Sequence, residues 1–315
     1  MVRPKPLPTG DRSNYLGSSD AAAILGLSPW RSKMQVYLEK NGLAEEIDDK
    51  KRAVFARGHR FEPVVIGMLC DELTAQGHEV RVMARNRRYV HNEHPFIGSE
   101  IDVELLVDGE EVNGEAKTVS PFAAKLWGAP DSGDVPLYYQ AQCMHAMSVY
   151  PRRRTVIGAM VGLDDFRVRW IERDDDLIQI ITAKEVEFWQ DVQAGRMPAP
   201  TTAGDVAWLY QDRGEAVEIT ADAALAVEKL RQIKLQQAAL DAEREQLELK
   251  IQLQMRDAAT ALDSTGRTLA TWRQNKERKA TDWKAVAQAL GASPALIEQH
   301  TRTEPGARVF RLTRG

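Results

Sequence analysis

Cysteine is scarce in this chain of 315 residues, and the two that occur, Cys70 and Cys143, lie far apart in the sequence. Two isolated cysteines cannot build a disulfide framework or a cysteine-based zinc site, so both are expected to be buried as small apolar side chains. Long apolar runs are also missing. No run approaches the roughly 20 residues of a membrane span, and residues 1–10 lack the apolar core of a secretory signal, so we expect a cytoplasmic protein.

A nucleotide-binding loop of the form G-x-x-x-x-G-K-[ST] is absent as well, so no nucleotide cofactor and no ATP-driven activity are expected. The composition, with 43% hydrophobic and 28% charged residues, is that of a globular protein with one large domain and a smaller one. The net charge of −4 is unevenly spread, because residues 267–315 contain ten Lys or Arg against four Asp or Glu, about +6, which leaves about −10 for the rest. A local basic surface for nucleic acid is therefore compatible with an acidic total.

Residues 97–117 contain the most informative pattern in the chain. β-branched and apolar residues flank an Asp108-Gly109 turn, which predicts two antiparallel strands joined tightly. Glu115 and Lys117 are two apart on the second strand and so share a face, and Asp102 would join them from the facing strand. Two carboxylates beside an ammonium suit a hard cation such as Mg²⁺, with waters and phosphate oxygens completing its shell. A hairpin with a solvated charged face gives the same spacing, so the pattern alone leaves both interpretations open.

The segments around the hairpin predict an α/β fold, in which a mixed sheet is flanked by helices. Strands are expected at 80–90, 152–161 and 166–171, and helices at 14–26, 28–42, 64–73, 120–127, 137–150 and 174–195. The Pro-containing stretch that begins at Arg196 ends this arrangement. We therefore predict a core domain at 1–200 and a linker at 201–214.

Four side chains near these segments are candidates for a site. Ser18 or Ser19 would cap the helix at 14–26, whose start suits either a phosphate or a plain cap, and Arg12 lies just upstream. Glu62 lies near the start of an apolar helical run, where a carboxylate either pairs with an Arg or reaches a metal. Gln140, in the first turn of the helix at 137–150, would point toward the strand ends, where it could hold a water or a phosphate.

Residues 215–315 form a predicted C-terminal extension. Residues 215–265 contain no Gly or Pro, and apolar residues recur at helical spacing with polar interruptions at Gln237 and Arg244, which predicts a long helix or a helical hairpin. Strands at 268–273 and 307–312 enclose a helix at 282–290. Trp272 lies beside Arg273, Lys276, Arg278 and Lys279. This small strand-helix-strand module would either bind single-stranded nucleic acid or bury its tryptophan.

Four motifs then fall in one order along the chain. They are Gly17-Ser18-Ser19-Asp20 with Leu27-Ser28-Pro29-Trp30, Arg57-Gly58 with Glu62-Pro63, Asp102 with Glu115-Ala116-Lys117, and Tyr139-Gln140-Ala141-Gln142. Over residues 10–200 this order resembles the YqaJ-like viral recombinase family, the phage alkaline exonucleases of the lambda exonuclease type in the restriction-endonuclease-like PD-(D/E)xK superfamily. The resemblance makes a nuclease the favoured interpretation.

The resemblance implies a role for each matching position. Asp102 and Glu115 match the metal-binding carboxylates, and the backbone carbonyl of Ala116 would complete the protein's share of the ligands. Lys117 matches the lysine that orients or deprotonates the attacking water. Glu62 matches the glutamate near a second metal position, and Gln140 matches the glutamine of the last core helix. Ser19 and Arg12 match the residues that help hold a 5′-terminal phosphate.

The implied function is an Mg²⁺-dependent, ATP-independent 5′–3′ double-stranded DNA exonuclease, with Mn²⁺ as a possible substitute metal. Such an enzyme resects linear duplex ends to 3′ single-stranded tails for recombination by single-strand annealing. The implied partners are duplex DNA ends, a phage single-strand annealing protein and further copies of the chain in a trimer, inside the cytoplasm of a bacterial host.

Two other functions fit parts of the sequence. A site-specific or structure-specific endonuclease would use the same residues but would need an element that reads the major groove, and the sequence offers none that we can identify. A non-catalytic DNA-binding scaffold would have no need of Asp102, Glu115 and Lys117 together. Digestion of linear but not covalently closed circular duplex would separate the exonuclease from both.

Overall fold

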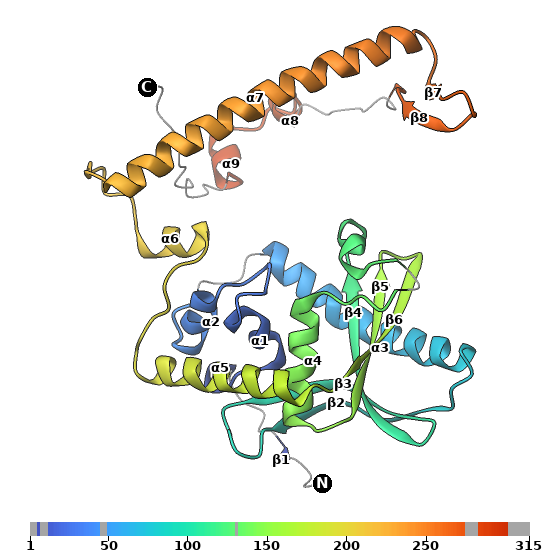
Figure 1. Cartoon of the computed structure of the whole chain (residues 1–315). Coiled ribbons are helices and arrows are strands. Elements are labelled where there is room, and N and C mark those ends of the chain that lie inside the picture. Colours follow the sequence, from blue (N-terminus) through green and yellow to red (C-terminus); the bar gives the residue numbers. More distant parts are fainter. Residues whose placement is uncertain (1–4, 7–11, 45–48, 130–131, 275–282, 302–315) are drawn as a thin grey trace. The chain divides into compact units, whose positions relative to one another are not determined.

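The computed structural model describes residues 5–6, 12–44, 49–129, 132–274 and 283–301 (Figure 1). The chain divides into two compact units, Met1–Gln211 and Asp212–Gly315. The first unit contains the central sheet and every candidate site residue, and it carries the argument below.

A six-stranded mixed sheet forms the centre of the first unit, in the order β1-β2-β3-β4-β5-β6. The strands are β1 (Lys5–Pro6), β2 (Val80–Val90), β3 (Gly98–Val107), β4 (Glu110–Val119), β5 (Arg154–Val161) and β6 (Asp165–Glu172). All neighbours are antiparallel except β4 and β5, which run parallel, so the chain must cross over between these two strands. The predicted turn at Asp108-Gly109 is confirmed, and both residues have positive φ angles of 50° and 81°, as tight hairpin turns require.

Helix α3 (Asp49–Ala75) covers one face of the sheet (Figure 1). Leu69 and Leu73 of this helix pack against three neighbouring strands, through Val103 of β3, Val112 of β4 and Val156 of β5. The helix is longer than predicted, because the chain stays helical through Pro63 instead of beginning there. A proline inside a helix removes one hydrogen bond and crowds the preceding turn, so the tertiary packing of the following apolar stripe overrides this local signal.

Helix α4 (Leu137–Val149) lies on the opposite face (Figure 1) and belongs to the crossover between β4 and β5. Cys143, Met144 and Met147 of α4 pack with Ile157 and Ala159 of β5 in a second buried cluster. Cys143 is therefore the buried small residue that the sequence suggested, whereas Cys70 is only partly buried. Helices on both faces of a mixed sheet confirm the predicted α/β class.

Shorter elements complete the first unit. They are the 3₁₀ turns η1 (Arg12–Asn14) and η2 (Pro121–Trp127) and the helices α1 (Ser18–Ile24), α2 (Lys33–Lys40), α5 (Asp175–Gln193) and α6 (Ala203–Leu209). Two predicted helix starts are wrong. The N-cap of α1 is Gly17, not Ser18 or Ser19, and α2 begins only after Ser32, whose hydroxyl accepts from the amide of Gln35. The predicted linker at 201–214 contains α6, whose Asp205 accepts a 2.6 Å hydrogen bond from Ser32.

The second unit contains the single long helix α7 (Ala221–Met255), a hairpin of β7 (Thr260–Leu262) and β8 (Thr268–Thr271), and the short helices α8 (Trp283–Ala289) and α9 (Pro294–Gln299). The predicted long helix, first strand and following helix are thus present. The predicted strand at 307–312 and the basic residues Lys276, Arg278 and Lys279 lie outside the described residues. In the described segments no helix is both long enough and apolar enough to cross a membrane.

Candidate active site

The predicted catalytic trio lies together on the α4 side of the sheet. Val103 faces α3, so its neighbour Asp102 points to the opposite face, and the pairing of Val103 with Gly114 brings Glu115 alongside. Lys117 follows two residues later on the same face. The alternation of two neighbouring strands is therefore sufficient to collect two carboxylates and an ammonium.

Glu115 is the hub of this group. Its Oε1 atom accepts a hydrogen bond from Lys117 Nζ, with which it also forms an ion pair, and a second one of 2.5 Å from Gln142 Nε2 of α4. Asp102 is held differently, because its Oδ2 atom accepts a 2.9 Å hydrogen bond from the amide of Ala116. Helix and sheet thus fix the two carboxylates independently, and neither depends on a flexible loop.

The charges of the group are unbalanced. Burial raises the pKa of Asp102 to about 8, and the neighbouring charge of Glu115 adds to the rise, while Lys117 and the Ala116 amide counteract it only in part. Burial alone would lower the pKa of Lys117, but Glu115 and Asp102 together raise it above its usual value. Lys117 is therefore a firmly protonated cation in a site that is still short of positive charge.

A bound divalent cation would supply the positive charge that Asp102 and Glu115 lack. In the described parts of the chain, no three His, Cys, Asp or Glu side chains form a cluster that could hold a metal ion by themselves. Two carboxylates are nevertheless what Mg²⁺ uses when waters and phosphate oxygens supply the other ligands. Asp102 and Glu115 would hold such an ion.

The other candidates are less closely involved. Glu62 lies in the middle of α3, 3.8 Å from His59 Nδ1, and reaches the trio only through its charge, which contributes slightly to the raised pKa of Asp102. Gln140 turns away, because its amide nitrogen donates to the carbonyl of Val135 at 2.7 Å. Gln142, and not the predicted Gln140, is therefore the glutamine of α4 that contacts the trio. Residues two apart on a helix point about 200° apart, so the choice between them needed the orientation of α4.

Arg12 and Ser19, the predicted phosphate pair, do lie together, since an Nη atom of Arg12 donates to Ser19 Oγ at 3.2 Å. Both are exposed. Gly17 makes room for this arrangement, because a Cβ atom at that position would come within 2.9 Å of the Arg12 guanidinium. Ser18, in contrast, is buried and bonds Ser99 Oγ of β3 at 2.8 Å, which ties α1 to the sheet.

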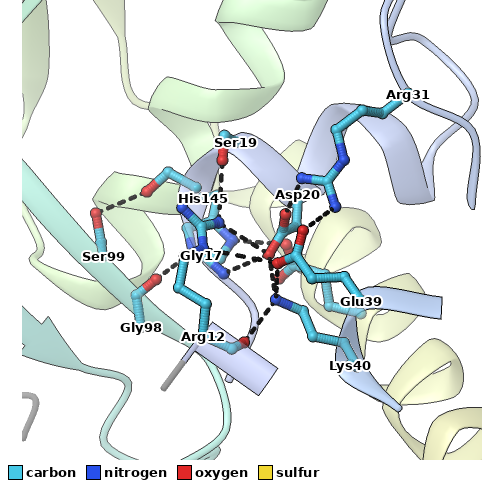
Figure 2. Close-up of polar contacts among 12 residues, drawn as sticks. Arg12, Gly17, Ser19, Asp20, Arg31, Glu39, Lys40, Gly98, Ser99 and His145 are labelled. Carbon is cyan, nitrogen blue, oxygen red and sulfur yellow. Dashed lines mark hydrogen bonds and ion pairs between the residues drawn. The ribbon is translucent and has the colours of Figure 1, made fainter. Parts of the chain in front are cut away.

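Beneath Arg12 lies a charged cluster that sequence reasoning missed (Figure 2). The fully buried carboxylate of Asp20 forms ion pairs with Arg12 at 3.2 Å, Arg31 at 2.9 Å and Lys40 at 2.9 Å. Glu39 contacts the same three cations at 3.8, 2.7 and 3.2 Å, respectively. Burial alone would raise the pKa of Asp20, but the three cations hold it well below its usual range. Three cations facing two carboxylates leave one positive charge in excess beside Ser19.

His145 of α4 bridges three elements nearby. Its Nδ1 lies 2.6 Å from Glu185 Oε1 of α5 and its Nε2 lies 2.9 Å from the carbonyl oxygen of Gly98 in β3. Both ring nitrogens face acceptors, so both must carry protons to donate. Burial alone would lower the pKa of His145, but Glu185 and then the Gly98 carbonyl and Asp20 raise it above its usual value.

This geometry predicts a pH-dependent contribution to stability. A histidine whose folded-state pKa is raised stabilises the protein fully below its unfolded pKa of about 6.5, and the contribution is lost as pH rises through the folded pKa. We expect His145→Gln to lose more unfolding free energy relative to the natural chain at pH 6 than at pH 9, as measured by urea unfolding at both values. An equal loss at the two pH values would show that His145 acts only by packing.

A known protein family covers the part of the chain that contains this site. Residues 9–154, which contain all the predicted site residues, match the model of the YqaJ-like viral recombinase domain. The chain is 28% identical over 262 residues to the protein YqaJ of Bacillus subtilis (strain 168), covering 79% of this chain and 77% of the relative. Two crystal structures of LHK-Exo, an alkaline exonuclease from Laribacter hongkongensis, one of them in complex with dAMP, align with TM-scores of 0.45 and 0.44 at 18% identity, covering 59% of this chain and 91% of theirs. The match over residues 9–154 confirms the resemblance to the YqaJ-like viral recombinase family that the sequence motifs suggested.

Proposed function

We propose, from the premise that residues 9–154 form a YqaJ-like viral recombinase domain, that this chain is a deoxyribonuclease. In full, the proposal is an Mg²⁺-dependent, ATP-independent exonuclease that resects linear duplex DNA from 5′ ends and leaves 3′ single-stranded tails for annealing. The observation that carries the proposal is the convergence of Asp102, Glu115, Lys117 and Gln142 on one face of the sheet. A scaffold or purely structural protein gains nothing from two crowded carboxylates in this position, since their mutual repulsion only costs stability.

In this proposal each residue of the site has a separate task. Asp102 and Glu115 would bind Mg²⁺, which supplies positive charge to neutralise the scissile phosphate. Gln142 and Lys117 fix the orientation of Glu115 through its Oε1 atom. Lys117 would also place its ammonium beside the attacking water and the developing negative charge.

Linear and covalently closed circular duplexes of the same sequence test the proposed function. We expect linear DNA, labelled separately at its 5′ and 3′ ends, to lose the 5′ label first in Mg²⁺ without ATP, while the closed circle stays intact and chelation by EDTA stops the reaction. Cleavage of the circle would favour an endonuclease built on the same residues. DNA binding without cleavage of either substrate would favour the non-catalytic DNA-binding scaffold.

The pair of Arg12 and Ser19 predicts a preference for phosphorylated ends. A guanidinium beside a hydroxyl, above a cluster with one excess positive charge, suits a terminal phosphate group. We expect 5′-hydroxyl duplex to be digested roughly tenfold more slowly than 5′-phosphorylated duplex, a charge-assisted contact being worth about 1.5 to 3 kcal/mol. Arg12→Ala should remove this difference, and Gly17→Ala should reduce it by displacing the guanidinium.

Arg196→Ala is the matched control for these variants, because Arg196 is an exposed arginine of the same unit that pairs with Asp191 away from this cluster. Its ratio of rates on the two kinds of end should equal that of the natural chain. If the natural chain digests both ends equally fast, Arg12 and Ser19 have no part in end recognition. The trimer, the annealing partner and the role of the second unit stay predictions from the sequence.

A further inference from the structure

Four aromatic side chains form a continuous row that starts at the active-site lysine and ends at the surface. The Tyr139 ring centroid lies 5.1 Å from Lys117 Nζ. Tyr139 contacts Trp127 at 5.4 Å and Tyr138 at 4.5 Å between ring centroids, and Trp30 lies edge-to-face on Tyr138 at 4.8 Å. Three segments build the row, since Trp30 lies between α1 and α2, the tyrosines occupy the first turn of α4, and Trp127, the last residue of η2, packs beside Tyr139.

Burial decreases steadily along this row. Trp127 is fully buried, Tyr138 and Tyr139 are half-buried, and Trp30 is 63% exposed. The inner rings belong to the core cluster that includes Ile157 and Ala159. Trp30 adds little to that core, so the burial of apolar area does not explain a large aromatic ring at this position. The rings beneath it instead hold it in a fixed place.

We propose that Trp30 and Tyr138 form a stacking platform for an unpaired nucleobase next to the scissile phosphate. The inference rests on the proposed function and adds a contact to the substrate that the catalytic trio does not make. A base inside a duplex has both faces covered by its neighbours, so only a terminal or unpaired base can stack on a protein ring. Exonucleolytic cleavage presents such a base at every step.

The charges around the platform favour a nucleic acid over an apolar protein partner. Lys117 lies beneath the inner ring, and Arg31, which belongs to the Asp20 cluster, directly follows Trp30 in the chain. Lys117 is paired with Glu115, but the Asp20 cluster, to which Arg31 belongs, has three cations against two carboxylates. This excess of positive charge matches a polyanion whose bases project from a charged backbone. Every base has a π-face, so the contact would strengthen binding without selecting a sequence, as a general exonuclease requires.

A double-mutant cycle between the protein ring and the DNA base tests the platform. The probe is a 5′-phosphorylated linear duplex in which the first two nucleotides of the 5′ strand are either normal or abasic, and its Kd is measured in EDTA so that cleavage does not interfere. Base–aromatic stacking predicts that removal of the bases weakens binding to the natural chain by roughly 5- to 100-fold. We call the ratio of the Kd for abasic DNA to the Kd for normal DNA the abasic effect. Trp30→Ala should weaken binding to normal DNA by a similar factor and so reduce the abasic effect to almost nothing, whereas Trp30→Phe should retain most of the abasic effect.

Phe122→Ala is the matched control, because Phe122 is an exposed aromatic residue of the same unit outside this row, 92% exposed on η2. It should keep the full abasic effect. Tyr138→Leu provides a second variant on the platform side and should reduce the effect as Trp30→Ala does. The inference is overturned if the losses from Trp30→Ala and from base removal simply add, or if Phe122→Ala abolishes the abasic effect equally well.

The two proposals fail in different ways. If the natural chain degrades linear duplex in Mg²⁺ but shows no coupling between Trp30 and the terminal bases, the platform is wrong and the exonuclease proposal stands. If the natural chain cleaves no DNA under any condition, the proposed function is wrong. A coupling close to the full stacking effect in a cleaving enzyme supports both.

Discussion

Asp102→Asn and Glu115→Gln are each expected to lower the rate of DNA cleavage by roughly 10³-fold or more, because each removes one of the two carboxylates that would bind the metal. DNA binding should change little, since neither carboxylate attracts a polyanion. The measurement is the initial rate of nucleotide release from 5′-phosphorylated linear duplex in Mg²⁺, with Kd for the same duplex measured in EDTA. Lys117→Ala is expected to give a comparable loss of rate with binding retained.

The fold provides an internal check on these variants. The raised pKa of Asp102 shows that its charged form is disfavoured by burial and by Glu115. An amide of the same shape removes that charge, so metal-free Asp102→Asn should be at least as resistant to urea unfolding as the natural chain. Gln142→Ala removes a hydrogen bond that orients Glu115 and should therefore lower the cleavage rate. Gln140→Ala is its matched control and should not, since both residues lie on α4 and only Gln142 reaches Glu115. Full activity of Asp102→Asn would remove the trio from the site.

Asp20→Asn is expected to destabilise the protein by about 3 to 5 kcal/mol, the usual cost of removing one partner from a buried ion pair. The carboxylate is fully buried, and its loss would leave Lys40, whose side chain is also fully buried, with Glu39 as its remaining anionic partner. The folded-state pKa of Asp20 is lowered, so its contribution is present above the unfolded pKa of about 4 and is lost as pH falls through the folded value. Urea unfolding at pH 7 measures the effect.

Glu187→Gln serves as the control for Asp20→Asn. Glu187 pairs with Lys184 on α5, but both side chains are more than half exposed, so this loss should leave the stability almost unchanged. A second measurement separates stability from position. Asp20→Asn, unlike Glu187→Gln, should also lose part of the preference for 5′-phosphorylated ends, because Asp20 holds the Arg12 guanidinium. If the free energy of unfolding of Asp20→Asn stayed within about 1 kcal/mol of that of the natural chain, the ion pairs of Asp20 would not contribute to stability as expected.

Local sequence signals predicted the structure correctly where the conformation of a single turn or strand decided it. Asp108-Gly109 predicted the hairpin because a tight turn needs positive φ angles, and alternation along β3 and β4 then placed Asp102, Glu115 and Lys117 on one face. Local sequence signals failed at two helix starts, where packing against the rest of the protein decides which residues are helical. Pro63 and the Ser28-Pro29-Trp30 motif both suggested helix starts, yet α3 continues through the first and α2 begins after the second.

The sequence by itself determined the α/β fold class and the shared face of Asp102, Glu115 and Lys117, because the period of a strand fixes the direction of every second side chain whatever surrounds it. Only the tertiary structure decided that Gln142 and not Gln140 reaches Glu115, since the rotation of α4 about its axis depends on its packing against β5. Only the tertiary structure brought Asp20, Arg31 and Lys40 together with Arg12. It also aligned the aromatic side chains between Lys117 and Trp30. Those contacts join separate elements, and the periodicity of one element carries no information about the distance to another.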